Sequence, residues 1–187
     1  MNCMLKERSL PLKTVDEYRE LFDFPVRDYY EKLGYNFDHE PFDEVGMEFI
    51  VQYNKRQGET RLHREALEVL EMFAGHGFSQ SILSAREQNE LVSEIKNQGI
   101  SGFFDHICGL DDHYAHGKTD VGIRLVNDLA MPKEKLLFIG DTRHDAEVAA
   151  EMGIDCILLP NGHQSRERLL WVGVPVLRSL MDLIELL

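Results

Sequence analysis

The chain has 187 residues, of which 43% are hydrophobic and 28% are charged, and this balance excludes collagen-like and intrinsically disordered proteins. Its 20 lysines and arginines against 33 aspartates and glutamates leave a formal charge of −13, which excludes ready binding to nucleic-acid phosphates or anionic membrane surfaces. No apolar stretch approaches the roughly 20 residues of a transmembrane helix, and charged residues at positions 6–8 interrupt the start where a secretory signal needs an apolar run. We therefore expect a cytoplasmic protein with three free thiols.

The first third of the chain has helical periodicity and no strand signal. Thr14 and Glu17 have the spacing of a capping box, in which a hydroxyl and a carboxylate satisfy free amides at a helix start. Apolar residues then recur three and four positions apart in short segments that prolines and glycines separate. The sequence predicts a small helical region over residues 1–64, followed by an α/β core domain over residues 65–187.

After Arg64 the pattern alternates between helix and strand. Helices are expected at 66–73, 87–97, 121–129 and 146–152, and strands at 78–83, from 107, at 136–139 and at 156–159, with further elements at 174–177 and 180–187. Successive strands joined by helices are parallel neighbours, because a parallel pair needs a crossover connection. The pattern predicts an α/β fold with a doubly wound parallel sheet.

Two carboxylates follow the apolar strand at 136–139. Asp141 comes directly after it and Asp145 four residues later, where a helix begins. Ligands of open parallel sheets bind outside the carboxyl ends of the strands, and Mg²⁺ prefers a few carboxylates together with water and phosphate oxygens. The alternative is structural: Asp145 caps the helix and Asp141 occupies the turn.

Ser84 and Lys118 lie at two other strand ends. Ser84 follows the strand at 78–83, where its hydroxyl and the free amides of the next helix could meet a phosphoryl oxygen. The alternative is that Ser84 and Glu87 form a capping box. Lys118 precedes a helix and could supply the positive charge that a phosphate needs, although a single lysine is more often a solvated surface group.

The run Leu137–Ala149, followed by Met152-Gly153-Ile154 and 160–165, resembles the haloacid dehalogenase-like hydrolases, in particular the branch similar to phosphoglycolate phosphatases. The likeness extends from about residue 5 to residue 187. It implies a Mg²⁺-dependent phosphatase of small phosphorylated metabolites, with residues 1–64 as a mobile cap that closes over substrate. It further implies that Asp141 and Asp145 serve the metal, that Ser84 and Ala85 contact the phosphoryl group, and that Lys118 neutralises its charge.

One element of this family's pattern is missing from the chain. The family's nucleophile is the first aspartate of an Asp-x-Asp-Gly-Thr segment near the amino terminus, and no aspartate here has a second aspartate two residues on. In the family that segment forms the central strand, between those expected here at 78–83 and 136–139. We therefore expect the chain to be inactive alone, through a truncated N-terminus or a natural loss. The alternative is a non-catalytic member of the fold that binds phosphate or a protein.

Overall fold

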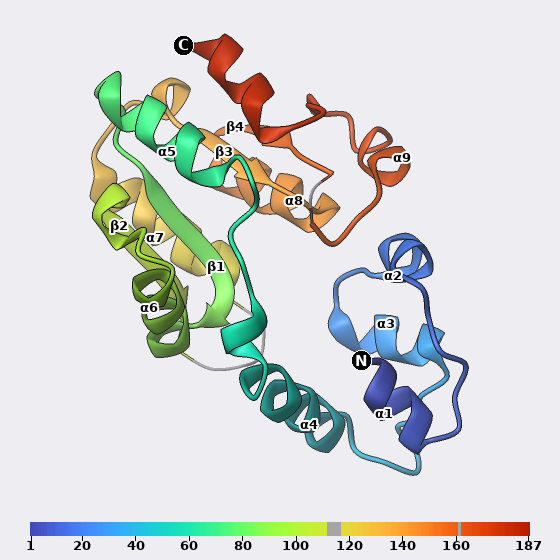
Figure 1. Ribbon diagram of the computed structural model, residues 1–187. Helices are drawn as coiled ribbons and strands as arrows, with labels where there is room; N and C mark the ends of the chain where they lie inside the picture. Colours follow the sequence, from blue (N-terminus) through green and yellow to red (C-terminus); the bar gives the residue numbers. More distant parts are fainter. Residues whose placement is uncertain (112–116, 161) are drawn as a thin grey trace.

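The computed structural model describes residues 1–111, 117–160 and 162–187. Helices alone occupy the first part of the chain, and helices and strands alternate after it (Figure 1). The elements are α1 (Asn2–Glu7), α2 (Val15–Leu21), α3 (Val26–Leu33), α4 (Phe42–Asn54), η1 (Gln57–Glu59), α5 (Ala66–Gly75), β1 (Ser81–Glu87), α6 (Gln88–Asn97), η2 (Ser101–Phe103), β2 (His106–Leu110), α7 (Lys118–Leu129), η3 (Lys133–Lys135), β3 (Leu137–Gly140), α8 (Arg143–Met152), β4 (Asp155–Leu158), α9 (Arg166–Leu169) and η4 (Leu180–Leu186).

Helices α1 to α4 enclose a core of their own. The predicted capping box at the start of α2 is confirmed: the Thr14 hydroxyl accepts from the Glu17 amide at 3.1 Å, and the Glu17 carboxylate accepts from the Thr14 amide at 2.8 Å. The core residues are almost fully buried and come from α1, α3, α4 and the segments that follow α2 and α3; they are Met4, Leu5, Phe22, Tyr29, Tyr30, Leu33, Tyr35 and Val45. This region therefore has a hydrophobic cluster separate from that of the strands.

The strands are parallel, as the alternating pattern predicts, but they form two pairs rather than one continuous sheet. β1 pairs with β2, with Leu83 opposite Cys108, and β3 pairs with β4, with Ile139 opposite Ile157. A further parallel bridge joins Leu158 to Val176 on the outer side of β4. Within the described residues no ladder joins β1 to β3. The interruption falls where the sequence analysis expects a central strand to be missing.

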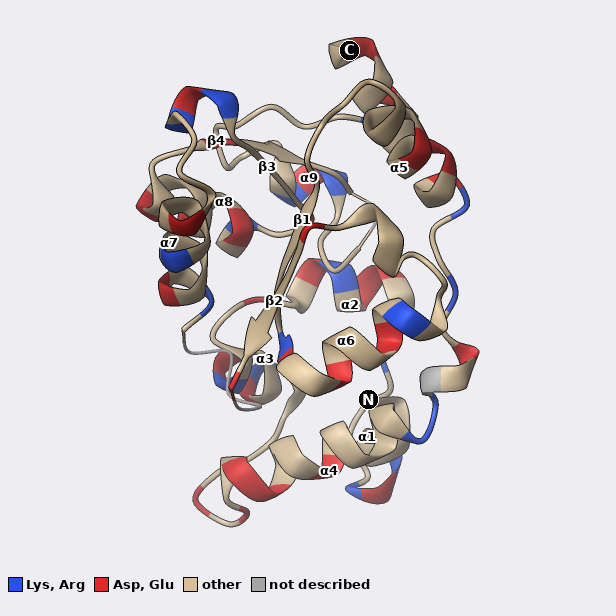
Figure 2. Cartoon of the chain, turned by 90° about the vertical axis from the view of Figure 1, so that its left-hand side faces the viewer, with Lys and Arg blue, Asp and Glu red and all other residues tan. Residues whose placement is uncertain are grey.

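Helices cover both faces of the strands, with α7 and α8 on one side and α5 and α6 on the other (Figure 2). On the first side, Val126 of α7 and Ala149 of α8 pack with Phe138 of β3 and Leu83 of β1. On the second side, α5 and η4 pack against β4 through Val69, Leu183 and Ile157. The larger part of the chain is thus an α/β layered structure.

Three helix starts differ from the expected positions: α6 begins at Gln88 rather than 87, α7 at Lys118 rather than 121, and α8 at Arg143 rather than 146. β1 continues to Glu87, and α6 begins at Gln88 with the Glu87 carboxylate accepting from the Glu90 amide at 2.8 Å. The capping box expected at Ser84 is therefore wrong. Lys118 lies within the first turn of α7 rather than before the helix.

Acidic side chains are spread over the surface, as the composition implies. Helices α4 and α5 carry acidic residues and no lysine or arginine (Figure 2). None of the helices in the described part of the chain is both long enough and apolar enough to cross a bilayer.

Candidate active site

The end of β3 holds a buried ion pair between Lys118 and Asp145. The Lys118 ammonium, on the first turn of α7, lies 2.5 Å from Oδ1 of Asp145, on the first turn of α8. The two side chains are only 11% and 6% exposed. The ammonium also lies 5.4 Å from the centre of the Phe138 ring. The strand end thus carries one positive charge whose position is set by a carboxylate and an aromatic face.

Asp145 is held by its own helix start as well as by Lys118. Its Oδ2 accepts from the backbone amides of Asp141 and Thr142, both at 3.0 Å, and from the Thr142 hydroxyl at 2.8 Å. Thr142 and Asp145 form a capping box at α8. Burial opposes ionisation of Asp145, but the Lys118 charge and these hydrogen bonds outweigh it, so the pKa of the Asp145 carboxyl is lowered. Asp145 is therefore an ionised group that both caps α8 and fixes Lys118.

Gly140 is required for this arrangement. A Cβ at Gly140 would lie 2.3 Å from the Cβ of Asp145, so no other residue fits without moving the helix start. The structure shows that the close approach is made by the Asp145 side chain.

Asp141 lies between β3 and the first region of helices. Its Oδ2 accepts from the backbone amide of His163 at 2.7 Å, and a Cβ at Gly162 would collide with that oxygen at 1.8 Å. The His163 ring in turn contacts the Tyr18 hydroxyl through Nδ1. Burial, with the neighbouring Tyr29 and Asp141, raises the pKa of Tyr18, so this phenol stays protonated. From the described residues, Oδ1 of Asp141 accepts no hydrogen bond.

Ser84 lies at an irregular point of β1. The ladder with β2 is interrupted between Leu83 and Glu87, so Ser84, Ala85 and Arg86 have no partner in register. The Ser84 hydroxyl accepts from the Arg86 amide at 3.2 Å, which leaves its proton free to donate. No described hydrogen bond links Ser84 to Lys118, Asp141 or Asp145. The structure thus joins Lys118 and Asp141 through Asp145, and leaves Ser84 unconnected to them.

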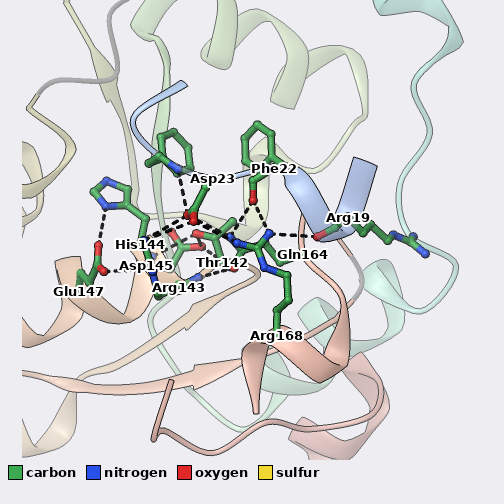
Figure 3. A network of polar contacts seen from close by, with 11 residues as sticks. Arg19, Phe22, Asp23, Thr142, Arg143, His144, Asp145, Glu147, Gln164 and Arg168 are labelled. Carbon is green, nitrogen blue, oxygen red and sulfur yellow. Dashed lines mark hydrogen bonds and ion pairs between the residues drawn. The ribbon is translucent and has the colours of Figure 1, made fainter. Parts of the chain in front are cut away.

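A polar network fastens the segment after α2 to the strand ends (Figure 3). The Asp23 carboxylate lies 3.0 Å from the Arg168 guanidinium and 3.4 Å from that of Arg143. Gln164, which is only 1% exposed, donates to the Phe22 carbonyl at 3.1 Å and accepts from the Arg143 amide at 2.8 Å. The network closes the helical region onto the loop that holds Asp141.

Asp141 and Asp145, which the family resemblance assigns to Mg²⁺, do not form a complete metal site by themselves. Both oxygens of Asp145 are occupied by protein donors, which leaves Asp141 as the available carboxylate. The described residues contain no group of three acidic, histidine or cysteine side chains arranged to hold a metal ion. Mg²⁺ is bound through one or two carboxylates plus waters and substrate phosphates, so Asp141 can serve only as part of a ligand set that other atoms complete.

Tyr18, Asp23 and Arg168 carry no functional signal in the sequence. Their partners lie about 145 residues away along the chain, and no local pattern signals such a contact. His163 and Gln164 lie in the segment 160–165, which is part of the family resemblance. The sequence of that segment alone does not predict which residues they contact.

Three comparisons place the chain among known proteins. A phosphoglycolate phosphatase of Pseudomonas syringae pv. tomato is 23% identical over 137 residues, which are 70% of this chain and 50% of that protein. The chain thus spans about half the length of the curated relatives it matches.

Solved structures share the fold. A haloacid dehalogenase-like hydrolase from Streptococcus pneumoniae superposes with a TM-score of 0.83 at 21% identity, over 97% of this chain and 85% of that one. A predicted phosphoglycolate phosphatase from Haemophilus somnus superposes with a TM-score of 0.71 at 17% identity, over 99% and 87%. The model of the haloacid dehalogenase-like hydrolases matches residues 1–159. Because this match covers most of the sequence, and the strand-end geometry agrees with it, the chain belongs to the haloacid dehalogenase-like hydrolase family.

Proposed function

We propose that this chain carries the helical cap, residues 1–64, and most of the core, residues 65–187, of a Mg²⁺-dependent phosphatase that hydrolyses small phosphomonoesters. The observation that carries the proposal is the Lys118–Asp145 pair at the end of β3, beside Asp141. A buried ammonium fixed by one carboxylate is a ready binding group for a phosphoryl oxygen, because its charge is oriented and poorly solvated. The phosphoglycolate phosphatases among the relatives support the substrate class.

The chain's own residues take three roles in this proposal. Lys118 binds a phosphoryl oxygen and neutralises charge, and Asp145 positions it. Ser84 donates its hydroxyl proton to another phosphoryl oxygen, and Ala85, which has no partner in register on β2, contacts the same group. The contacts of Tyr18 and Asp23 with the core hold the cap over the site and exclude water.

The proposal needs a nucleophile from outside residues 1–187. The family reaction passes through an aspartyl-phosphate, formed when a carboxylate oxygen displaces the alcohol from phosphorus and then hydrolysed by water. Mg²⁺ supplies charge neutralisation to such a reaction, and Asp141 would be one of its ligands. We expect the chain alone to show no turnover.

The test compares three proteins with p-nitrophenyl phosphate and Mg²⁺. These are the chain itself, a form extended ahead of Met1 by a strand that carries Asp-x-Asp, and a matched extension with Asn-x-Asp. Turnover by the Asp-x-Asp form alone is expected, and Lys118→Met in that form should lower kcat/KM by roughly 100-fold or more. An inactive Asp-x-Asp form that is folded would contradict the proposal.

The second candidate is a member of the fold that binds phosphate or a protein without turnover. The observation that favours it is that Lys118 and Ser84 are present while the described acidic groups leave no complete metal site. An in-frame stop codon directly upstream of the Met1 codon, together with a rise in Tm on adding inorganic phosphate to the chain, would select this function over catalysis.

A further inference from the structure

A cavity lies between α2 and α9. Its volume is about 450 Å³, which is within the range of sites for small organic molecules. Its walls include three arginines, namely Arg19 of α2, Arg166 of α9 and Arg178. None of the described residues that line it belongs to the strand-end site, and Figure 3 shows the Arg19 side chain pointing away from Asp145 and Thr142. The cavity is therefore a second place at which a ligand can bind.

The arginines of the cavity have no carboxylate partner. Among the ion pairs of the described residues, none involves the guanidinium of Arg19, Arg166 or Arg178. The Nε atom of Arg166 is moreover buried without a hydrogen-bond partner in the described structure. A buried donor without an acceptor is unfavourable and is rare in folded proteins. An oxygen atom brought by an anionic ligand would satisfy this donor.

Burial separates the positive from the negative side chains of the cavity. Arg19 and Arg166 are partly buried. The acidic residues that also line the cavity are all exposed; they are Asp16, Glu20 and Glu167. Exposed charges are solvated and screened by salt, whereas partly buried charges are screened much less. The partly buried wall is therefore positive and favours an anion, although the whole chain carries a formal charge of −13.

Contacts of Arg168 hold the two walls of the cavity together. Its guanidinium donates to the Arg19 carbonyl at 3.1 Å and lies 3.0 Å from the Asp23 carboxylate. The Ser165 hydroxyl, which lines the cavity, accepts from the Arg168 amide at 3.3 Å, and this leaves its proton available to a ligand. Because these walls are fixed before a ligand arrives, the ordering cost of binding is low.

We propose that this cavity binds a small anion that carries at least two carboxylate or phosphate groups. A guanidinium holds such a group through two parallel N–H···O bonds, and Arg19 and Arg166 come from different walls, so two groups can be bound at once. The Ser165 hydroxyl can donate to a further oxygen. The inference goes beyond the proposed phosphatase function, because the site needs neither a nucleophile nor Mg²⁺.

Calorimetric titration of the intact chain without Mg²⁺ tests the site, with citrate and pyrophosphate as probes that distinguish carboxylate from phosphate recognition. At least one probe is expected to bind. Arg19→Met and Arg166→Met should each raise its Kd about tenfold or more, because each removes charge-assisted hydrogen bonds. Arg27→Met removes an exposed arginine paired with Glu31 and is the matched control, with an expected change in Kd of less than about twofold. The proposal is overturned if neither probe binds, or if all three variants raise Kd equally.

Hydrogen exchange locates the bound probe and separates this cavity from the strand-end site. The amides of α2 and α9 are expected to exchange about tenfold more slowly when the probe is bound. Protection confined to the starts of α7 and α8 would mean that the probe binds beside Lys118, and that result would refute the proposal. The chain is tested without any extension. An inactive Asp-x-Asp form would therefore contradict the phosphatase and leave this result unaffected.

Discussion

Removing Asp145 should be among the most destabilising single changes in this core. Its carboxylate is 6% exposed, pairs with the Lys118 ammonium at 2.5 Å and accepts three further hydrogen bonds through Oδ2. Asp145→Ala deletes all of these contacts and leaves a lysine that is 11% exposed without its partner. Gly140 packs directly against the side chain, so the truncation also opens space at the start of α8.

The size of the expected loss in the free energy of unfolding follows from Lys118, which stays buried without its partner. Leaving one member of a buried pair uncompensated costs about 3–5 kcal/mol, and losing a helix cap costs about 0.5–2 kcal/mol. The two terms overlap, because the same carboxylate makes both, so we expect a loss of about 4 kcal/mol in the free energy of unfolding. For a chain of this size that corresponds to a Tm lower by roughly 8–16 °C.

Urea denaturation measures the free energy of unfolding that each contact contributes. The proteins compared are the wild-type chain, Asp145→Ala, Lys118→Met and the double variant. Removing Lys118 as well should restore part of the loss, because no unpaired ammonium then remains at the strand end. Thr142→Ala is a control for the cap alone, with an expected cost of about 1 kcal/mol. A loss below about 1 kcal/mol in Asp145→Ala, or strictly additive effects of the two substitutions, would refute the assignment of a stabilising buried pair.

Three further outcomes are expected. Asp23→Asn, which removes the ion pair with Arg168 at 3.0 Å, should reduce hydrogen-exchange protection in α2 about tenfold. Because the pKa of Asp145 is lowered on folding, its contribution to stability is present above about pH 4 and is lost as the pH falls below that value, as urea titrations at pH 7, 4 and 3 will measure. Burial raises the pKa of the Cys156 thiol to about 12, so Ellman's reagent at pH 8 should modify the exposed Cys3 and leave Cys156 intact.

Each of these expectations has a matched control. Glu31→Gln removes an ion pair whose side chains are both 51% exposed, and it should leave exchange in α2 unchanged. Asp145→Asn should weaken the dependence of stability on pH below about 4, and an unchanged dependence would reject Asp145 as its source. Modification of Cys156 at the rate of Cys3 would contradict its burial.

Local signals predicted much of the fold because their physical causes are local. The Thr14–Glu17 capping box and the parallel strands agree with the sequence reasoning. The expected capping box at Ser84 is wrong, because β1 continues to Glu87 and that residue caps α6 instead. The Ser84–Glu87 spacing matches the capping-box pattern, but pairing of Glu87 with Leu110 of β2 keeps the chain extended as far as Glu87.

The candidate site, like the fold, was predicted from the sequence only in part. The order of Asp141, Asp145 and Lys118 after strand ends predicts that charged groups gather at one edge, since parallel strands place their carboxyl ends together. The sequence alone determined the helical region at residues 1–64, the parallel strands and the choice of these three residues as site candidates. It could do so because hydrophobic periodicity and the residues at strand ends are local features of a few positions. Only tertiary structure decided that both oxygens of Asp145 are occupied by Lys118 and the start of α8, and that Asp23 reaches Arg168. Those outcomes depend on burial and on partners far apart in the chain, which no local pattern encodes.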